Sequence, residues 1–348
     1  MSPLALVLLL AALPHSAMSE SVVSSSPVLR IAAADRSSAT FGGARSLADM
    51  YNWRHLAGRE FMLENKTLAV AVASGGAVAN LADLSAARTE LALVRADIAD
   101  AAYQNPEQFG LDKNINRIRL VATHKPEFLH IVVRNDFAGT TVADLADKRV
   151  STAAIGASTL FQLNEMLQAQ GTSTSKLQQY HIPLRESFER LRRGQLDAVV
   201  YFDQTPSGLV VEGLASGELR LLSLDHEALQ QFQSTPAGAL VQASRAATFY
   251  SGADDVLALQ LPTYLLAQSY VSVADTEVLL DNLNVVVNDE QQAEQNQTAG
   301  SPGHSTAFVV DDKLSPIPLH AGSQLLLDIF SDVVPEPPST RNVSEVNQ

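Results

Sequence analysis

Short apolar runs alternate with amphipathic segments along most of the chain. Residues 29–34, 68–73 and 91–94 are apolar runs of strand length. Each run leads through a loop into apolar positions spaced three and four apart, the period of an amphipathic helix. The first loop is expected to span Asp35 to Gly43, with the helix following from Leu47. Strand, loop and helix in repetition predict a parallel sheet with right-handed crossovers.

A second set of alternating elements begins near residue 128. Its expected strands are 129–133, 149–153 and 196–202, and its expected helices are 160–167 and 187–193. Further elements continue to about residue 330, interrupted by a polar, glutamine-rich loop at 289–304. The pattern predicts an α/β protein of two hinge-linked lobes, each with a parallel or mixed sheet flanked by helices.

The two ends of the chain differ from the rest. Residues 3–13 form an apolar core of signal-peptide length, and the small residues Ala17 and Ser19 suit cleavage before Glu20. A buried N-terminal helix or an uncleaved anchor is the alternative. We expect a signal peptide at 1–19, a linker at 20–27, a first lobe of 28–126 and 245–331, a second lobe of 127–244 and a disordered tail at 332–348.

Composition excludes several classes of function. The chain has 38 acidic and 24 basic residues, a net charge of −14, which disfavours a general nucleic-acid binder. The absence of cysteine excludes thiolate catalysis, disulfides and cysteine-ligated metals. The eight histidines show no metal-ligand spacing, and neither a G-x-S-x-G elbow nor a dinucleotide G-x-G-x-x-G occurs. We therefore expect no catalytic residues, no metal and no cofactor.

Seven short motifs in order carry a family resemblance. They lie at 73–81, 89–97, 129–134, 142–150, 156–159, 194–198 and 318–323. The first, Ala73-Ser74-Gly75-Gly76-Ala77-Val78-Ala79-Asn80-Leu81, resembles a Gly-Gly turn followed by S/A-x-x-N-L. In this order the chain is similar, over residues 29–330, to the TAXI-type solute receptors of TRAP (tripartite ATP-independent periplasmic) transporters.

The resemblance implies a fold, a location and partners. It implies a two-lobed periplasmic binding protein of type II-like fold; the N-terminal segment predicts export, and a monomer is the default expectation. Such a receptor captures a small anionic solute, an organic acid or an amino acid (glutamate-like or a dicarboxylate), in the cleft between its lobes. It hands that solute to the membrane permease subunits of a TRAP transporter; docking to a sensor protein instead is the alternative.

Two departures from the family pattern fall where ligand contacts are expected. The loop 34–43 is longer and more polar than the family's glycine-rich first loop, and Arg95 stands where the family has glutamine. The resemblance therefore does not carry over the identity of the ligand.

Ligand-binding residues are expected beyond the carboxyl ends of the strands, where loops and helix starts converge. Ser74-Gly75-Gly76 leads from a strand into a helix, and Ser158-Thr159 does the same in the second lobe. Amides at two facing helix starts, together with hydroxyls including that of Thr40, suit a carboxylate. The alternative is that these hydroxyls only cap their helices.

Three further candidates follow strand ends. Arg95 could bind an acidic solute bidentately, or pair with Asp97 instead. Tyr201 and Gln204 are expected to line the cleft, with Phe202 in the core. The complete expected set is Thr40, Ser74, Gly75, Gly76, Arg95, Ser158, Thr159, Tyr201 and Gln204.

Four other conspicuous residues are expected to serve the fold. Asp203 follows the same strand and suits a cap or a hinge group. His130 lies inside an apolar strand and is expected to be a hydrogen-bonded core residue. Arg134 and Trp53 are expected to have structural roles as well.

Overall fold

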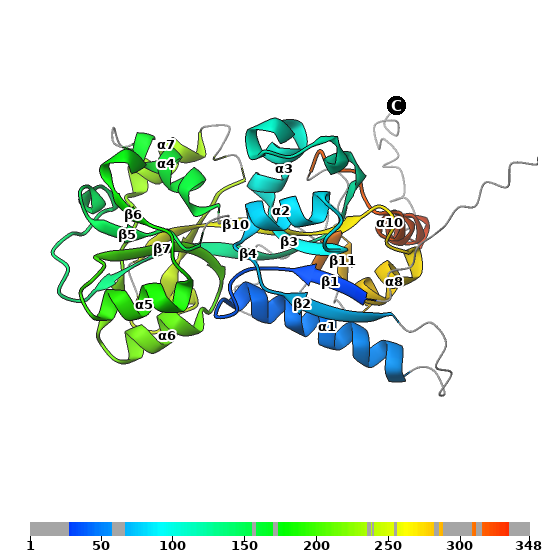
Figure 1. The fold of residues 1–348 in the computed structure, drawn as a ribbon, viewed down its shortest axis with the longest axis horizontal. Helices are drawn as coiled ribbons and strands as arrows, with labels where there is room; N and C mark the ends of the chain where they lie inside the picture. Colours follow the sequence, from blue (N-terminus) through cyan, green and yellow to red (C-terminus); the bar gives the residue numbers. More distant parts are fainter. Residues whose placement is uncertain are drawn as a thin grey trace, which may run out of the picture.

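A computed structural model gives the structure of most of the chain (Figure 1). It describes residues 28–57, 67–154, 158–169, 173–234, 238, 240–253, 256–281, 285–287, 308–310 and 315–333. The expected signal peptide, linker and 289–304 loop lie outside this part. Helix α10 extends to Val333, past the expected start of the tail at 332, and the rest of the tail is outside the described residues. Within the described part, no helix combines the length and the apolarity needed to cross a membrane.

The strands of the described chain form one mixed sheet. They are β1 (Val28–Ala32), β2 (Leu68–Val72), β3 (Leu91–Arg95), β4 (Ile118–Arg134), β5 (Arg149–Ser151), β6 (Gln178–Tyr180), β7 (Ala198–Gln204), β8 (Leu219–Leu221), β9 (Gln242–Arg245), β10 (Leu257–Gln268), β11 (Val285–Val287) and β12 (Phe308–Val310). The main path through the sheet runs β2-β1-β3-β10-β4-β7-β5-β6.

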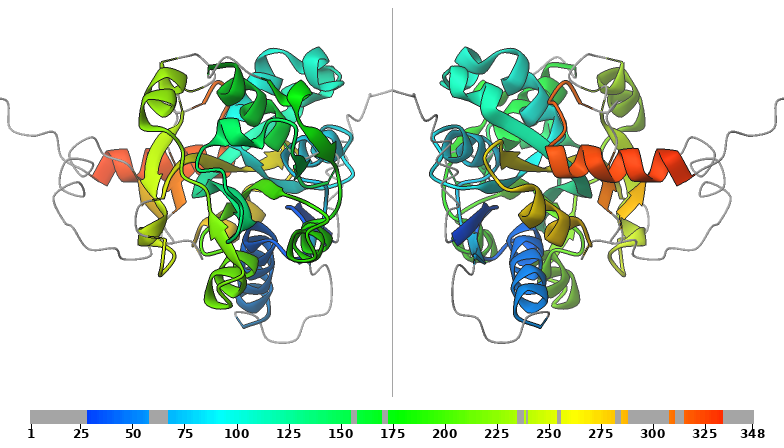
Figure 2. Two further views of the ribbon diagram at one scale, coloured as in Figure 1. Left: turned by 90° about the vertical axis from the view of Figure 1, so that its left-hand side faces the viewer. Right: turned by 90° about the vertical axis from the view of Figure 1, so that its right-hand side faces the viewer.

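Helices cover both faces of this sheet. They are α1 (Ala39–Ala57), α2 (Ala77–Ser85), α3 (Ala96–Gln104), α4 (Thr159–Ala169), α5 (Leu184–Arg192), α6 (Gly208–Ala215), α7 (His226–Gln233), α8 (Val273–Asp281) and α10 (Ala321–Val333). Figure 2 shows α1 and α3 on opposite sides of the first-lobe strands.

The predicted parallel pairing is present at both ends of the path. β1 pairs in parallel with β2 and β3, and β5 pairs in parallel with β6 and β7. The centre differs, because β10 runs antiparallel to both β3 and β4. The pattern analysis missed β10 and the first half of β4, since these long strands carry proline and polar residues that interrupt an apolar run.

The two long strands are also the connections between the lobes (Figure 1). Pro126 lies within β4 and Pro262 within β10, and the register between the strands shifts from Thr263 opposite His124 to Leu261 opposite Glu127. Proline has no N–H to donate, so neither strand can keep a regular ladder at this point. The paired prolines mark the place where the sheet is most easily bent.

In the first lobe, alternate residues of each strand enter different cores. Leu91 and Leu93 face a core shared with α1 and α8, whereas Ala92 and Val94 face a core shared with α2 and α3. This alternation follows from the pleat, which points successive side chains to opposite faces. Both faces are apolar because both are covered, as is usual for parallel strands.

The second lobe is built in the same way. α4 and α7 cover one face of its strands, and α5 and α6 cover the other. Helix α5 shows how: Leu184, Phe188 and Leu191 recur along one side and are buried. Several residues between 246 and 261 also pack in the cores of the second lobe. The chain therefore re-enters the first lobe near Pro262 rather than at the expected residue 245.

Helix α1 begins earlier than expected. It starts at Ala39, so Thr40, Gly42 and Gly43 belong to the helix and not to the preceding loop. Gly43 permits a close approach to the crossing strands, because a Cβ there would lie 3.0 Å from Oε1 of Gln204 and 3.4 Å from Nε2 of His124. The start of α1 is therefore packed directly against the region between the lobes.

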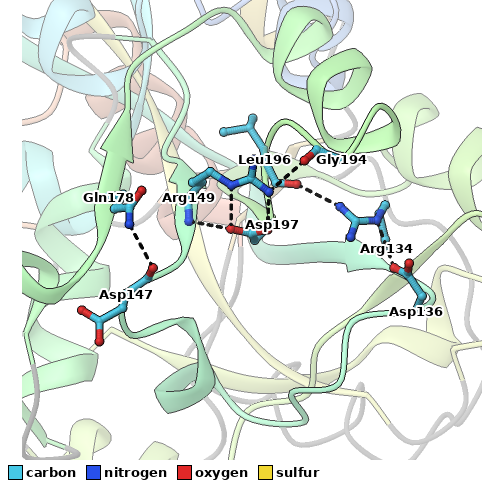
Figure 3. A network of polar contacts seen from close by, with 8 residues as sticks. All are labelled: Arg134, Asp136, Asp147, Arg149, Gln178, Gly194, Leu196 and Asp197. Carbon is cyan, nitrogen blue, oxygen red and sulfur yellow. Dashed lines mark hydrogen bonds and ion pairs between the residues drawn. The ribbon is translucent and has the colours of Figure 1, made fainter.

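Two of the family-like motifs meet in an ion pair (Figure 3). Arg149 donates from Nε and Nη2 to both carboxylate oxygens of Asp197, at 3.0 and 2.7 Å, and from Nη2 to the carbonyl of Gly194 at 2.8 Å. Arg134 donates to the carbonyl of Leu196 at 3.2 Å, which confirms its expected structural role. These motifs hold β5 against β7, and their residues do not line the cavity between the lobes.

The core position Leu91 and the edge position Leu68 provide a matched pair of substitutions. Leu91 is fully buried in the central strand β3, whereas Leu68 on the edge strand β2 is 43% exposed. We expect Leu91→Ala to lower the free energy of unfolding by about 2–5 kcal/mol and Leu68→Ala to lower it by less than about 1 kcal/mol. Urea unfolding followed by circular dichroism measures both, and equal effects would contradict the described packing.

Candidate functional site

A cavity of about 50 Å³ lies between the two lobes. Its volume is enough for a few water-sized groups. The lining residues come from both lobes: Ala33, Ala34, Asp35, Ser38, Gly75, Gly76, Ala77, Asn80, Leu93, Glu127, Ala153, Ala154, Ser158, Thr159, Leu184, Tyr201 and Phe202. Most of them follow the carboxyl ends of β1, β2 and β5 or begin α2, α4 and α5. This is the place where open α/β sheets bind ligands.

The start of α2 forms one wall of the cavity. Gly76 precedes the helix with φ 120° and ψ −163°, a conformation available to glycine and not to residues with a Cβ. Gly76 is the N-cap residue, and it has no side chain that could cap the helix. Gly75, Gly76 and Ala77 line the cavity, so the start of α2, where its dipole is positive, borders it.

Asn80 holds that wall in place. It is buried on α2 and donates from Nδ2 to the carbonyl of Leu93 at 2.7 Å and also to the carbonyl of Ala33. The Ser74 hydroxyl lies 2.7 Å from the same Ala33 carbonyl and accepts the Gly76 N–H at 3.1 Å. Ser74 thus stabilises the turn before α2, a structural role of the kind expected as the alternative to ligand binding.

The second lobe contributes the opposite wall. Ser158 and Thr159 stand at the start of α4 and line the cavity. Ala153, which also lines it, has φ 64°, a left-handed conformation that is uncommon for alanine. The Tyr201 hydroxyl is 2.9 Å from Oγ of Ser207 and so is already paired. Tyr201 therefore offers the cavity its ring rather than its hydroxyl.

The lobes exchange helix caps across the cavity. Asp203, at the end of β7, accepts the N–H groups of Ala39 and Thr40 at the start of α1, both at 2.9 Å. In the other direction Asp35, which follows β1, accepts the N–H of Leu184 at the start of α5 at 3.3 Å. Asp203 is thus a cap, one of the two structural roles expected for it.

Glu127 lies beside this contact on β4. The Thr40 hydroxyl is 3.0 Å from Oε1 of Glu127 and 3.1 Å from Oδ1 of Asp203, so it connects the two carboxylates. Burial raises the pKa of Glu127 to about 7, although Arg95 opposes that shift, and burial raises the pKa of Asp203 to about 6 against its backbone hydrogen bonds. Glu127 is therefore close to half-protonated near neutral pH, whereas Asp203 is mostly ionised there.

Arg95 does not reach the cavity. Its side chain is completely buried and donates from Nε and Nη2 to both carboxylate oxygens of Asp97, at 2.6 and 2.9 Å. Asp97 also accepts a hydrogen bond from Gln162 of the second lobe. The guanidinium carbon lies 3.7 Å from the centre of the Phe202 ring. The ion-pair alternative is therefore the observed state of Arg95.

The structure brings together part of the expected set. Five of the nine expected residues line the cavity: Gly75, Gly76, Ser158, Thr159 and Tyr201. Thr40, Ser74, Arg95 and Gln204 are not among the lining residues; Gln204 is buried beside Gly43 instead. Phe202, expected in the core, is half-buried and lines the cavity. Whether the lining residues bind a ligand stays a prediction.

Sequence analysis missed two acidic lining residues. Asp35 directly follows the first strand, so the rule that selected Ser74 could have selected it. Glu127 was missed because the strand containing it was expected to begin at residue 129, whereas β4 begins at Ile118. His130 is a hydrogen-bonded core residue as expected, with Nε2 2.6 Å from the Tyr250 hydroxyl.

Comparison with known proteins places the chain in a family. The model of the NMT1-like family matches residues 39–325, and the chain belongs to this family. Solved structures show weaker similarity. The alkanesulfonate-binding protein SsuA from Xanthomonas axonopodis pv. citri, bound to MOPS, is 16% identical with a TM-score of 0.45, over 88% of this chain and 92% of that one. Arginine-bound ArgBP from T. maritima (a Gly52Ala mutant) is 12% identical with a TM-score of 0.42, over 74% of this chain and 94% of that one.

The buried pair of Arg95 and Asp97 predicts a stability effect rather than a selective loss of binding. Removing the guanidinium leaves the Asp97 carboxylate buried without its cation, so we expect Arg95→Ala to cost about 3–5 kcal/mol of unfolding free energy. Arg45→Ala is the control, since Arg45 and Asp49 are both more than 70% exposed and 3.8 Å apart; it should cost less than about 1 kcal/mol. Chemical denaturation measures both. Wild-type stability of Arg95→Ala would show that this arginine is not a structural element.

Proposed function

We propose that the protein is an exported solute receptor that captures a small organic acid or amino acid between its lobes and delivers it to a membrane permease. The binding event forms and breaks no covalent bond. The free energy of ligand contacts with both lobes favours the closed arrangement over an open one. The apolar N-terminal segment 3–13 supports export to the periplasm.

One observation carries this proposal: a small cavity enclosed jointly by two lobes, with helix starts from each lobe in its wall. A solute in this position contacts both lobes at once, so its binding and the closure of the lobes are the same event. The strands that connect the lobes contain Pro126 and Pro262 at one level, beside a register shift, and neither proline donates a ladder hydrogen bond there.

The carboxylate of the solute is assigned to the starts of α2 and α4. Their first-turn amides carry partial positive charge, and Gly75, Gly76, Ser158 and Thr159 line the cavity there. By contrast, the starts of α1 and α5 already bind carboxylates of the protein itself. We therefore assign the ligand carboxylate to the starts of α2 and α4, which line the cavity.

The transporter type follows from the motif series. The ordered motifs between residues 73 and 323 resemble TAXI-type receptors, so we propose a TRAP-type permease as the partner. Two of those motifs form the Arg149–Asp197 pair within the second lobe. They support the fold of this subfamily rather than a particular ligand.

A thermal-shift panel of carboxylates, amino acids and sugars tests the proposal. At a ligand concentration of about 100 times Kd, binding to the native state adds about 2.7 kcal/mol to the unfolding free energy. We expect a clear rise in Tm with at least one acid or amino acid. The variant Ala34→Leu, which fills the cavity with three extra carbon atoms, should abolish that rise.

Ala215→Leu is the matched control, because Ala215 is exposed on α6 in the second lobe and the same atoms are added there outside the cavity. It should respond to the solute as the wild type does. A panel with no response, or a response that survives in Ala34→Leu, would contradict a receptor with this binding site.

A further inference from the structure

The charged residues in the cavity wall are acidic. Asp35 and Glu127 line the cavity, and none of its lining residues is lysine, arginine or histidine. The chain as a whole carries a net charge of −14, but this does not decide the sign of a local site. The charges of the residues in the cavity wall decide the sign of the site.

The surroundings of Glu127 contain more negative than positive charge. Arg95, Asp97 and Asp203 are the charged groups that act on it, together with the neutral hydroxyl of Thr40. Asp97 binds the guanidinium of Arg95 at two atoms. The cluster therefore contains one cation, Arg95, and three carboxylates, those of Glu127, Asp97 and Asp203.

Glu127 also has the fewest hydrogen bonds of the carboxylates at the cavity. Asp203 accepts backbone N–H groups from three residues and Asp35 accepts them from two. For Glu127, the described part of the chain records a single donor, the Thr40 hydroxyl on Oε1. This side chain is partly buried, and its accessible surface lines the cavity. A partly buried carboxylate with so few donors has acceptor positions left for a cationic group in the cavity.

We propose that the solute carries a protonated amine, which binds in the cavity against the acidic wall of Glu127 and Asp35. This inference rests on the proposed receptor function and narrows the solute to small aminocarboxylic acids. The carboxylate of such a solute is assigned to the starts of α2 and α4, and its ammonium to the Glu127 and Asp35 carboxylates, which line the same cavity. A dicarboxylate is disfavoured, because its second carboxylate would lie against a wall of the same charge.

The dimensions agree with this assignment. An ammonium group is compact and has three donors, so it can satisfy the open positions on two carboxylates within a cavity of about 50 Å³. It also supplies the positive charge that Arg95 does not bring into the cavity.

Matched pairs of probes that differ in the amine alone test the inference. The probes are alanine with propionate, and glutamate with glutarate, titrated into the full protein by calorimetry at pH 7.5. A charge-assisted hydrogen bond corresponds to a factor of about 10 to 100 in affinity. We expect the amine-bearing member of a pair to bind more tightly by that factor.

The variant Glu127→Gln should reduce this preference to less than about threefold, since it keeps the size and the Thr40 contact and removes the charge. Asp49→Asn is the control, because Asp49 is 71% exposed on α1, and it should retain the wild-type preference. Equal or tighter binding of the desamino acid by the wild type overturns the inference and leaves the receptor function standing. No binding of any probe, with a silent solute panel, overturns the receptor function as well.

The pH dependence of the wild type gives a second test that needs no variant. The pKa of Glu127, about 7, reflects burial, with Arg95 lowering it and Asp203 and Asp97 raising it. The amine stays protonated through this range, so amino-acid affinity should rise severalfold from pH 5.5 to 8 as Glu127 ionises. A fall in amino-acid affinity over the same range would contradict the inference.

Discussion

The closed arrangement depends on two carboxylates that each cap a helix of the other lobe. Asp203 of the second lobe accepts the first amides of α1, and Asp35 of the first lobe accepts the first amide of α5. Helix starts carry unsatisfied N–H groups that must find partners when they are buried. Because those partners lie across the interface, opening the lobes exposes both helix starts and both carboxylates at once.

This exchange explains the charges left in the cavity. At two of the helix starts at the site, those of α1 and α5, carboxylates of the protein itself accept the first amides, whereas the starts of α2 and α4 line the cavity. Glu127 stands on the crossing strand β4 next to the Thr40 hydroxyl that it shares with Asp203. The cavity is therefore lined both by helix starts and by the carboxylates of Asp35 and Glu127.

Much of the fold follows from local patterns, because most buried strands are short apolar runs and most helices carry an apolar stripe. β1, β2, β3 and the second half of β4 were predictable for that reason, and so was the capping role of Asp203. β10 was not, since Pro262 and the polar residues around it resemble a loop in the sequence. The return crossing between the lobes was misplaced for the same reason.

The candidate site was predictable only where strand ends were located correctly. Gly75 and Gly76 were found because a glycine pair after a strand has a specific conformational use, which φ 120° at Gly76 illustrates. Arg95 was assigned to the cleft from its place after an apolar run, but the register turns it toward Asp97 and under Phe202. A single sequence does not show which neighbour a strand-end side chain will meet.

In the proposed receptor, two lobes close over a shared cavity and Asp203 holds them closed. Because the chain has no cysteine, spin labels attached at Asp49→Cys on α1 and Val211→Cys on α6 report the distance between the lobes directly, and both positions are exposed. Pulsed electron paramagnetic resonance should give one narrow distance with a stabilising solute, and an added longer population without it that grows in Asp203→Asn. An identical narrow distance with and without solute, unchanged in Asp203→Asn, would contradict the account.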